Sequence, residues 1–270
     1  MYKLVALDMD GTLLREDKTI SDRTKKAISD ARKMGTTVVL ATGRPIEGVR
    51  KVLKELDMLT DKDYVLSYNG ALVQKTSDKK VISKVALSGR DALELYKLSK
   101  ELGVNIHAFS ETLGLVTPKM SKYTEVEAEI NDIEVKIMDM NTIKEDDVII
   151  KIMMIDEPEI LGPAFDKLPK EIFEKYTVVR STPYFLEFLN KEANKGVGVE
   201  LLAKHLGIKQ EEIITMGDAG NDKHMIEYAG LGVAMGNAFD EIKEIANYIT
   251  DTNENDGVAK TIEKFILEKK

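Results

Sequence analysis

The stretch Tyr2–Thr12, YKLVALDMDGT, decides the fold of this 270-residue chain. Its first six residues form an almost continuous apolar run that stops at Asp8. A short run without alternation of apolar and polar residues is typical of a strand covered on both faces, as in a parallel sheet. The polar turn DMDGT then places two carboxylates just beyond the carboxyl end of that strand. We therefore interpret the segment as the first strand of an α/β fold.

The residues that follow alternate between amphipathic stretches and apolar runs. Residues 21–34 carry apolar side chains at helical spacing, with Ser21 as a suitable N-cap. Two apolar runs, residues 36–41 and 64–68, are separated by a predicted helix that Pro45 opens. The order strand, helix, strand, helix, strand predicts an α/β fold with a doubly wound, Rossmann-like parallel sheet.

Polar residues follow each of these apolar runs. Thr42 and Gly43 come after the second run, and Asn69 comes after the third. In open α/β sheets, ligands bind beyond the carboxyl ends of the strands, so we expect Asp8, Thr42 and Asn69 to converge on one crevice. The hydroxyl and N–H groups of Thr42-Gly43, at the start of a helix, suit an anion. Most segments of this kind are nevertheless simple strand-to-helix turns.

The alternation breaks after Asn69, where residues 71–74 and 81–85 predict a hairpin that leaves the sheet. The middle of the chain then mixes helices and strands, and the doubly wound pattern returns at Lys195. We therefore predict a core of residues 1–85 and 190–270 with an inserted α+β cap domain, residues 86–189. The predicted cap helices are residues 90–102, 121–130 and 158–168, and its strands are 104–109, 113–117, 148–155, 176–180 and 185–189.

Composition excludes several classes of site and partner. The 39 basic and 47 acidic side chains give a formal charge of −8, which argues against nucleic acid or an anionic membrane as the main partner. The chain has no cysteine and only three histidines, which excludes disulfides and thiolate sites and disfavours a histidine-rich metal site. No apolar run approaches the ~20 residues of a membrane span, and nothing resembles a signal peptide. The sequence predicts a soluble, cytoplasmic protein, and no pattern indicates an oligomeric state.

Asp8 and Asp10 are the first candidate catalytic residues. Two carboxylates beside a glycine that lets the backbone turn can address an electrophile and its leaving group separately. An aspartate is an established covalent nucleophile toward phosphoryl groups. Taken alone, the pattern fits a capping aspartate and an Asp-Gly turn equally well. A calcium loop fits poorly, because Thr12 and Leu13 stand where an EF-hand needs Asp or Asn and then Gly.

The loop Gly217–Asp222, GDAGND, follows another apolar run and supplies more oxygen ligands. Mg²⁺ takes a few hard oxygen ligands from protein and completes its octahedron with water and phosphate. Asp8 and Asp218, at two strand ends, meet that need. By itself the loop is better described as a turn with a helix cap at Asp222. Lys195 precedes a helix and gains significance only in the company of these acids.

Together these motifs resemble those of the haloacid dehalogenase-like hydrolases, and specifically the Cof-type sugar-phosphate phosphatases. The resemblance spans essentially the whole chain and implies a Rossmann-like core with an inserted cap. Four motifs match in order, and two further segments resemble subfamily features. The four are Asp8–Thr12, Thr42–Arg44, Lys195-Gly196 and Gly217–Asp222, and the two are Asn69–Ala71 and Gly236–Ala238.

The resemblance also implies a role for each site residue. Asp8 is the implied nucleophile, and Asp10 is the implied acid that protonates the leaving oxygen and then the base that activates water. The implied cofactor is Mg²⁺, held by Asp8, the Asp10 carbonyl and Asp218, with Asp222 as a further metal-site residue that positions Lys195. The implied phosphate-binding residues are Met9, Thr42, Gly43, Lys195 and Asn221.

The implied function is a Mg²⁺-dependent phosphatase that acts on small phosphomonoesters, with sugar phosphates foremost, through an aspartyl-phosphate. Two alternatives stay open at this point. A phosphomutase would pass the phosphoryl group to a sugar phosphate instead of water, and product analysis would distinguish it. A module that senses a phosphorylated metabolite without turnover is disfavoured by the intact Asp8–Asp10 pair, and a phosphate-release assay would distinguish that one.

Overall fold

A computed structural model describes residues 1–268 and separates the chain into two compact units. The core unit consists of Met1–Lys84 and Asn194–Lys270, and the inserted unit of Val85–Ala193. The sequence placed the two boundaries after residues 85 and 189. The second boundary lies later because Ala193 is buried and Asn190 bonds back to the Ala86 carbonyl inside the inserted unit.

The core is built on one eight-stranded sheet with the order β15-β14-β13-β1-β2-β3-β4-β5. The strands from β15 to β3 are parallel, while β4 and β5 add antiparallel pairs at one edge. The chain runs outward from β1 in both directions, so that the strand order reverses between β1 and β13. The strands are β1 Leu4–Leu7, β2 Thr37–Ala41, β3 Tyr64–Ser67, β4 Leu72–Lys75, β5 Val81–Lys84, β13 Ile213–Gly217, β14 Leu231–Ala234 and β15 Tyr248–Ile249.

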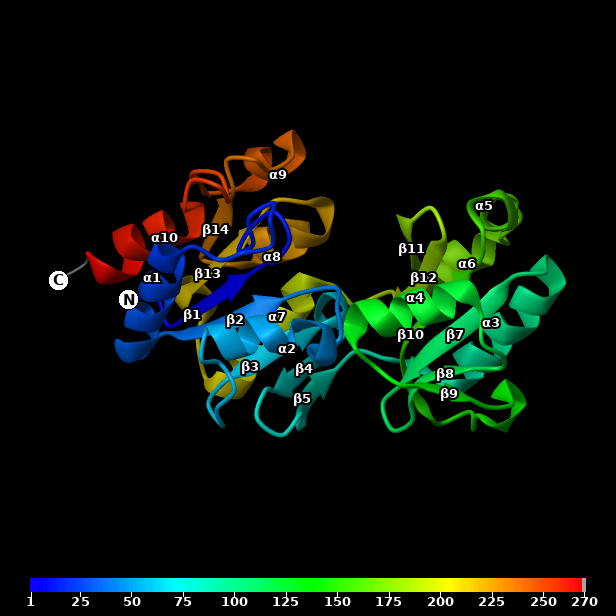
Figure 1. Cartoon of the computed structure of the whole chain (residues 1–270). Coiled ribbons are helices and arrows are strands. Elements are labelled where there is room, and N and C mark those ends of the chain that lie inside the picture. Colours follow the sequence, from blue (N-terminus) through cyan, green and yellow to red (C-terminus); the bar gives the residue numbers. More distant parts are fainter. Residues whose placement is uncertain (269–270) are drawn as a thin grey trace. The chain divides into compact units, whose positions relative to one another are not determined.

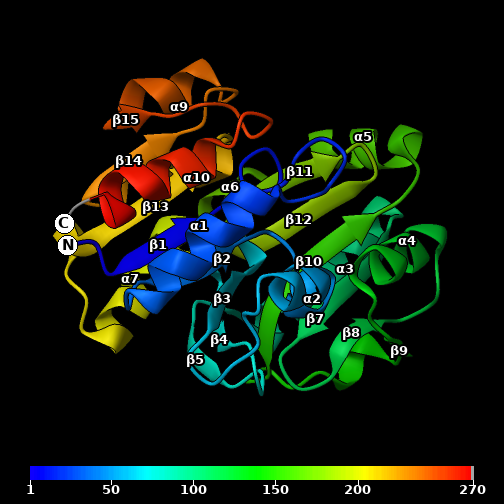
Figure 2. The same cartoon turned by 60° about the vertical axis from the view of Figure 1, so that its left-hand side comes forward.

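Helices cover both faces of this sheet, as the doubly wound pattern predicts (Figures 1 and 2). Helices α1 and α10 pack together on one face, and α7 packs with α8 on the other. The N-cap prediction is confirmed, because the Ser21 side chain accepts a hydrogen bond from the Thr24 N–H. The helices are α1 Asp22–Lys33, α2 Ile46–Glu55, α7 Lys195–Leu206, α8 Lys223–Tyr228, α9 Asp240–Ile245 and α10 Gly257–Ile262, with short turns η1 Tyr68–Gly70, η3 Gln210–Glu212, η4 Gly220–Asp222 and η5 Glu263–Leu267.

The prediction that a hairpin leaves the sheet after Asn69 is wrong. Strand β4 pairs antiparallel with β3, and β5 pairs with β4, so the hairpin extends the core sheet at its edge. Its apolar side chains explain this position, because Leu72 and Val73 are buried and Val73 belongs to the core cluster. Helix α9 and strand β15 were not predicted; both are short, and the periodic signal of so few residues is weak.

The inserted unit contains a second, mostly antiparallel sheet with the order β11-β12-β10-β7-β8-β9, and β6 pairs with β10. The cluster of Ile106, Ala108, Ile152, Met154 and Phe188 forms its apolar core together with α3 and α5. The strands are β6 Leu87–Ser88, β7 Asn105–Ser110, β8 Gly114–Thr117, β9 Val135–Ile137, β10 Val148–Ile155, β11 Tyr176–Thr182 and β12 Phe185–Asn190; the helices are α3 Gly89–Leu102, α4 Lys122–Asn131, α5 Pro158–Asp166 and α6 Lys170–Lys175, with the turn η2 Met140–Thr142.

The fold class is therefore confirmed: a doubly wound α/β core interrupted by an α+β unit. Within residues 1–268, none of the helices has the length and apolar character needed to cross a bilayer.

Candidate active site

The candidate residues lie at the carboxyl ends of neighbouring parallel strands. Asp8 follows β1 and Asp218 follows β13, and the Asp8 N–H donates to the Met216 carbonyl at 3.0 Å across these two strands. Thr42 follows β2 in the same way, and its N–H donates to the Leu66 carbonyl of β3 at 2.9 Å. Parallel pairing thus aligns the strand ends, at the point where the strand order reverses.

Three carboxylates meet beyond these strand ends. Asp8, Asp218 and Asp222 each offer an oxygen, and these oxygens lie within 4.8 Å of one another. Asp8 and Asp222 are buried and Asp218 is half-buried. Burial raises the pKa of Asp218, and the nearby charge of Asp222 raises it further. Like charges at this separation favour a cation or a proton between them.

Lys195 is the cation that already faces this cluster. It is the first residue of α7, and its side chain is fully buried. Its Nζ lies 2.5 Å from Asp8 Oδ1 and 2.6 Å from Asp222 Oδ1. Burial opposes the charge on Lys195, but Asp8 and Asp222 outweigh that effect and raise its pKa. Burial raises the pKa of Asp8 to about 7, although the charge of Lys195 opposes this shift.

Asp222 is held by backbone as well as by Lys195. Its Oδ2 accepts from the N–H groups of Asp218 (2.9 Å) and Ala219 (3.0 Å), while its Oδ1 accepts from Lys195. Both carboxylate oxygens are therefore engaged. This arrangement suits the positioning of Lys195 and of the Asp218 loop better than direct contact with a metal.

The Asp10 carboxylate is not part of the three-carboxylate cluster. Its side chain is 41% exposed, and it is paired with Lys18 at 2.8 Å and with Arg44 at 2.7 Å. Burial of the carboxyl favours its neutral form, but the hydrogen bond from Lys18 and the charge of Arg44 prevail and lower its pKa. Sequence reasoning missed both partners, because neither a lysine eight residues away nor the arginine after Gly43 carries a signal for this contact.

Thr42, Gly43 and Asn221 come together around Asn69. The Asn69 N–H donates to the Thr42 carbonyl at 2.8 Å, and Asn69 Oδ1 accepts from Asn221 Nδ2 at 3.2 Å. A Cβ on Gly43 would stand 3.4 Å from the Asn69 amide, so these two residues are neighbours. Thr42 and Asn69, two of the three strand-end residues expected to converge, are therefore in direct contact. Asn69 has left-handed backbone angles, a conformation that asparagine tolerates well.

Met9 differs from the other predicted phosphate-binding residues. Its side chain is buried in the core cluster, and its carbonyl accepts the Leu14 N–H at 2.8 Å. Its side chain therefore contributes to the packing of the core. If Met9 contacts phosphate, it would do so through its backbone N–H.

Thr12 is a site residue that sequence reasoning did not assign. Its hydroxyl donates to Asp218 Oδ1 at 2.8 Å, so it orients a carboxylate 206 residues away in the sequence. The sequence places Thr12 in the DMDGT turn but does not show that its side chain is buried. A threonine in a turn has many other uses, so its position alone did not indicate a contact with Asp218.

The donor set fits a hard divalent cation such as Mg²⁺. Lys195 donates a hydrogen bond to Oδ1 of Asp8, and Thr12 donates one to Oδ1 of Asp218. Carboxylate oxygens are the ligands that Mg²⁺ prefers, usually one or two from protein together with water and substrate phosphate. A cation between Asp8 and Asp218 would also offset the charge of Asp222, which adds to the effect of burial and raises the pKa of both groups.

Comparison with known proteins agrees with this geometry. Residues 5–262 match the family described as haloacid dehalogenase-like hydrolase. YxeH of Bacillus subtilis (strain 168), named as a candidate phosphatase, is 44% identical over 100% of both chains. The phosphatase YitU of the same organism, named for 5-amino-6-(5-phospho-D-ribitylamino)uracil, is 30% identical over 97% of both chains.

A solved structure shares the same architecture. It is the sugar phosphatase BT4131 of haloacid dehalogenase subclass IIB, with 25% identity and a TM-score of 0.75 over 97% of this chain and 98% of that one. Sequence, fold and the arrangement of the strand-end residues lead to one assignment. The chain belongs to the haloacid dehalogenase-like hydrolase family and is a phosphatase of that family.

Proposed function

We propose that this phosphatase hydrolyses small phosphomonoesters, with sugar phosphates foremost, by a Mg²⁺-dependent route through an aspartyl-phosphate. The observation that carries the proposal is the contact of buried Lys195 with Asp8 inside the cluster formed by Asp8, Asp218 and Asp222. A buried carboxylate oriented by a lysine, and with acids beside it that could hold a metal ion, suits a nucleophile that attacks a phosphate ester.

Asp8 supplies the nucleophile. A carboxylate oxygen of Asp8 attacks phosphorus, a P–O bond forms, and the bond from phosphorus to the ester oxygen breaks. Water then attacks the aspartyl-phosphate, the bond from phosphorus to the Asp8 oxygen breaks, and inorganic phosphate leaves. Positioning and electrostatics supply most of the acceleration in phosphoryl transfer.

Asp10 moves the protons. In the first half-reaction its carboxyl proton passes to the leaving ester oxygen, and in the second its carboxylate takes a proton from the attacking water. The contacts with Lys18 and Arg44 keep Asp10 ionised before substrate binds. An incoming phosphate dianion would attract those two cations, and loosening of the contacts would let Asp10 take up the proton that it delivers.

Lys195, Thr42, Gly43 and Asn221 would hold the phosphate oxygens, with the Met9 N–H as a further donor. Asp222 keeps Lys195 in place through the 2.6 Å contact. Asp8, Asp218 and the Asp10 carbonyl would hold Mg²⁺. When bound, Mg²⁺ neutralises negative charge on the phosphate and on the acids around it.

The substrate class is drawn from the relatives and from the charge of the chain. BT4131 is named a sugar phosphatase, and YitU is named for a substrate with a phosphorylated ribityl chain. The net charge of −8 offers little attraction for nucleic acid. A phosphorylated sugar or polyol is therefore the first class of substrate to test.

The test is phosphate release from a panel of phosphorylated sugars, polyols and nucleotides, with Mg²⁺ present and a folded phosphoprotein for comparison. We expect release from small sugar or polyol phosphates, and its loss in Asp8→Asn, whose amide is a poor nucleophile. Asp17→Asn is the matched control, because Asp17 is exposed and bonds only with Thr19 among the contacts described. Turnover by pure Asp8→Asn, or transfer of phosphate to sugar without release, would overturn the proposal.

A further inference from the structure

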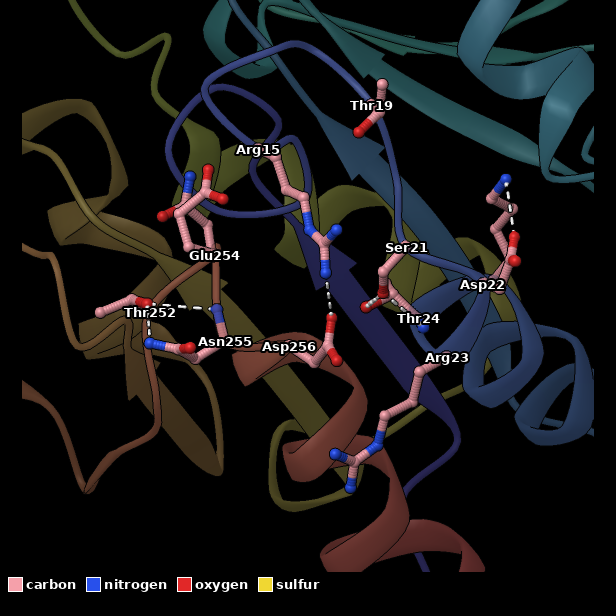
Figure 3. A network of polar contacts seen from close by, with 12 residues as sticks. Arg15, Thr19, Ser21, Asp22, Arg23, Thr24, Thr252, Glu254, Asn255 and Asp256 are labelled. Atoms are coloured by element: carbon pink, nitrogen blue, oxygen red, sulfur yellow. Dashed lines mark hydrogen bonds and ion pairs between the residues drawn. The ribbon is translucent and has the colours of Figure 1, made fainter.

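The loop that follows the catalytic aspartates, Gly11–Ile20, is fastened to two segments near the end of the chain. We call this segment the β1 loop. Asn237 Nδ2 donates to the Gly11 carbonyl at 2.8 Å, and Asn253 Nδ2 donates to the Leu14 carbonyl at 2.9 Å. Further along, Arg15 points toward Asp256 and contacts it at 3.0 Å (Figure 3). The loop is therefore held from one side at several points.

The two asparagines act as a unit. The Asn253 N–H donates to Asn237 Oδ1 at 3.0 Å, while Asn237 Nδ2 donates to Gly11. The Asn237 side chain thus accepts a hydrogen bond from Asn253 and donates one to Gly11. An amide can do both, whereas a carboxylate or an alanine cannot. The pair bridges the turn at Asn237, the segment at Asn253 and both ends of the tetrapeptide Gly11–Leu14.

This tetrapeptide carries the residue that orients a candidate metal ligand. Thr12 donates to Asp218 Oδ1, and the backbone at Gly11 lies against the same carboxylate. A Cβ on Gly11 would come within 2.4 Å of Asp218 Oδ2, and the φ of +89° is one that L side chains rarely adopt. Asp218 is therefore packed directly on the tetrapeptide, and a displacement of the tetrapeptide would displace the carboxylate.

The turn that contains Asn237 also contacts Asp218 directly. The Phe239 N–H donates to the Asp218 carbonyl at 3.0 Å. The turn thus touches the Asp218 backbone through Phe239 and the β1 loop through Asn237. The turn therefore connects the tetrapeptide to the Asp218 backbone through two hydrogen bonds.

We propose that Asn237 and Asn253 are positioning residues that hold Thr12 against Asp218 and thereby set the affinity of the site for its divalent cation. This inference rests on the proposed function, which places the cation at Asp8 and Asp218. Neither asparagine has a described contact with the three carboxylates, so their effect passes through the tetrapeptide. Outer-shell partners of metal ligands typically change affinity or activity about 10–100-fold when replaced.

The experiment measures Mg²⁺ binding by calorimetry, without substrate, for the full chain and three variants. Asn237→Ala removes both bonds of the bridge, and Asn253→Ala removes only the hold on Leu14 because its backbone N–H remains. Asn255→Ala is the matched control: it lies in the same segment, but its amide bonds to Thr252 (Figure 3). We expect the Mg²⁺ dissociation constant to rise about tenfold in Asn237→Ala, less in Asn253→Ala, and not in the control.

A second readout separates positioning from a merely structural role. At saturating Mg²⁺, we expect the KM for substrate to stay near the wild-type value, while the Mg²⁺ concentration for half-maximal kcat rises with the dissociation constant. A lower melting temperature with unchanged Mg²⁺ affinity in both variants would overturn the inference. If Asn237→Ala does not fold, Asn253→Ala decides alone. Absence of Mg²⁺ binding by the wild type would instead contradict the proposed function.

Discussion

Lys195 and Asp222 form an ion pair at 2.6 Å in which neither side chain has exposed surface. Asp8 joins the pair at 2.5 Å, and its own side chain is 10% exposed. Desolvation makes such a pair a poor source of net stability, yet removal of one partner leaves an uncompensated buried charge. We therefore interpret the buried pair of Lys195 and Asp222 as one that orients Asp8.

The first prediction is that Lys195→Met destabilises the core strongly. Asp8 and Asp222 would lose their shared cation, and breaking a buried pair in this way costs about 3–5 kcal/mol. Urea unfolding monitored by circular dichroism measures the change. Lys204→Met is the control, because Lys204 lies on the same helix but is 68% exposed. Equal unfolding midpoints for the two variants would refute the role given to Lys195.

The second prediction concerns metal removal. Excess EDTA should stop turnover, and added Mg²⁺ should restore it, because Asp8 and Asp218 cannot both stay charged beside a phosphate without a cation. Mg²⁺ should also raise the melting temperature of the wild type without substrate, since a ligand that binds only the folded state stabilises it. Full activity in EDTA would exclude a metal-dependent route.

The third prediction is that Asp10→Asn slows both half-reactions. Loss of a general acid or base costs typically about 10²–10⁴-fold. A substrate with a good leaving group needs little protonation, so its first step should suffer less than that of an alkyl phosphate. The measurement is burst and steady-state kinetics on aryl and sugar phosphates. Equal losses for both substrates, with chemistry rate-limiting, would contradict the proton-transfer role of Asp10.

The fourth prediction concerns His107, which is buried in the inserted unit near Thr124 and Met153. Burial, with a smaller effect of the charge of Lys151, lowers its pKa from 6.5 to about 3. The unfolded chain therefore binds a proton that the folded chain rejects, and stability falls as the pH drops from 6.5 toward 3. The titration of His107 alone should lower the free energy of unfolding by about 2 kcal/mol between pH 7 and pH 5.

Comparison of the wild type with His107→Gln isolates this effect, because the other titrating groups are common to both proteins. Urea unfolding at pH 7 and pH 5 should show a smaller loss of stability in the variant than in the wild type. Exchange of the β7 amides, which lie beside His107, should report the same difference locally. Parallel stability curves for the two proteins would show that His107 is not held neutral.

Local structure was predictable wherever neighbouring residues in the sequence determine it. The apolar run of β1 and the N-cap of α1 at Ser21 were found because burial on both faces and capping act within a few residues. The hairpin β4–β5 was recognised as a hairpin, but its place in the sheet was not. That place depends on the free edge of β3, which no local pattern describes.

The sequence by itself determined the α/β alternation and the set of polar residues at the strand ends, because in parallel strands the residue after the last apolar position falls at one edge of the sheet. Only the tertiary structure decided which of them touch. Lys195 reaches Asp8 across 187 positions, Arg44 reaches Asp10 across 34, and Thr12 reaches Asp218 across 206. These contacts depend on the path of the whole backbone and on burial, and both arise only when distant segments pack together.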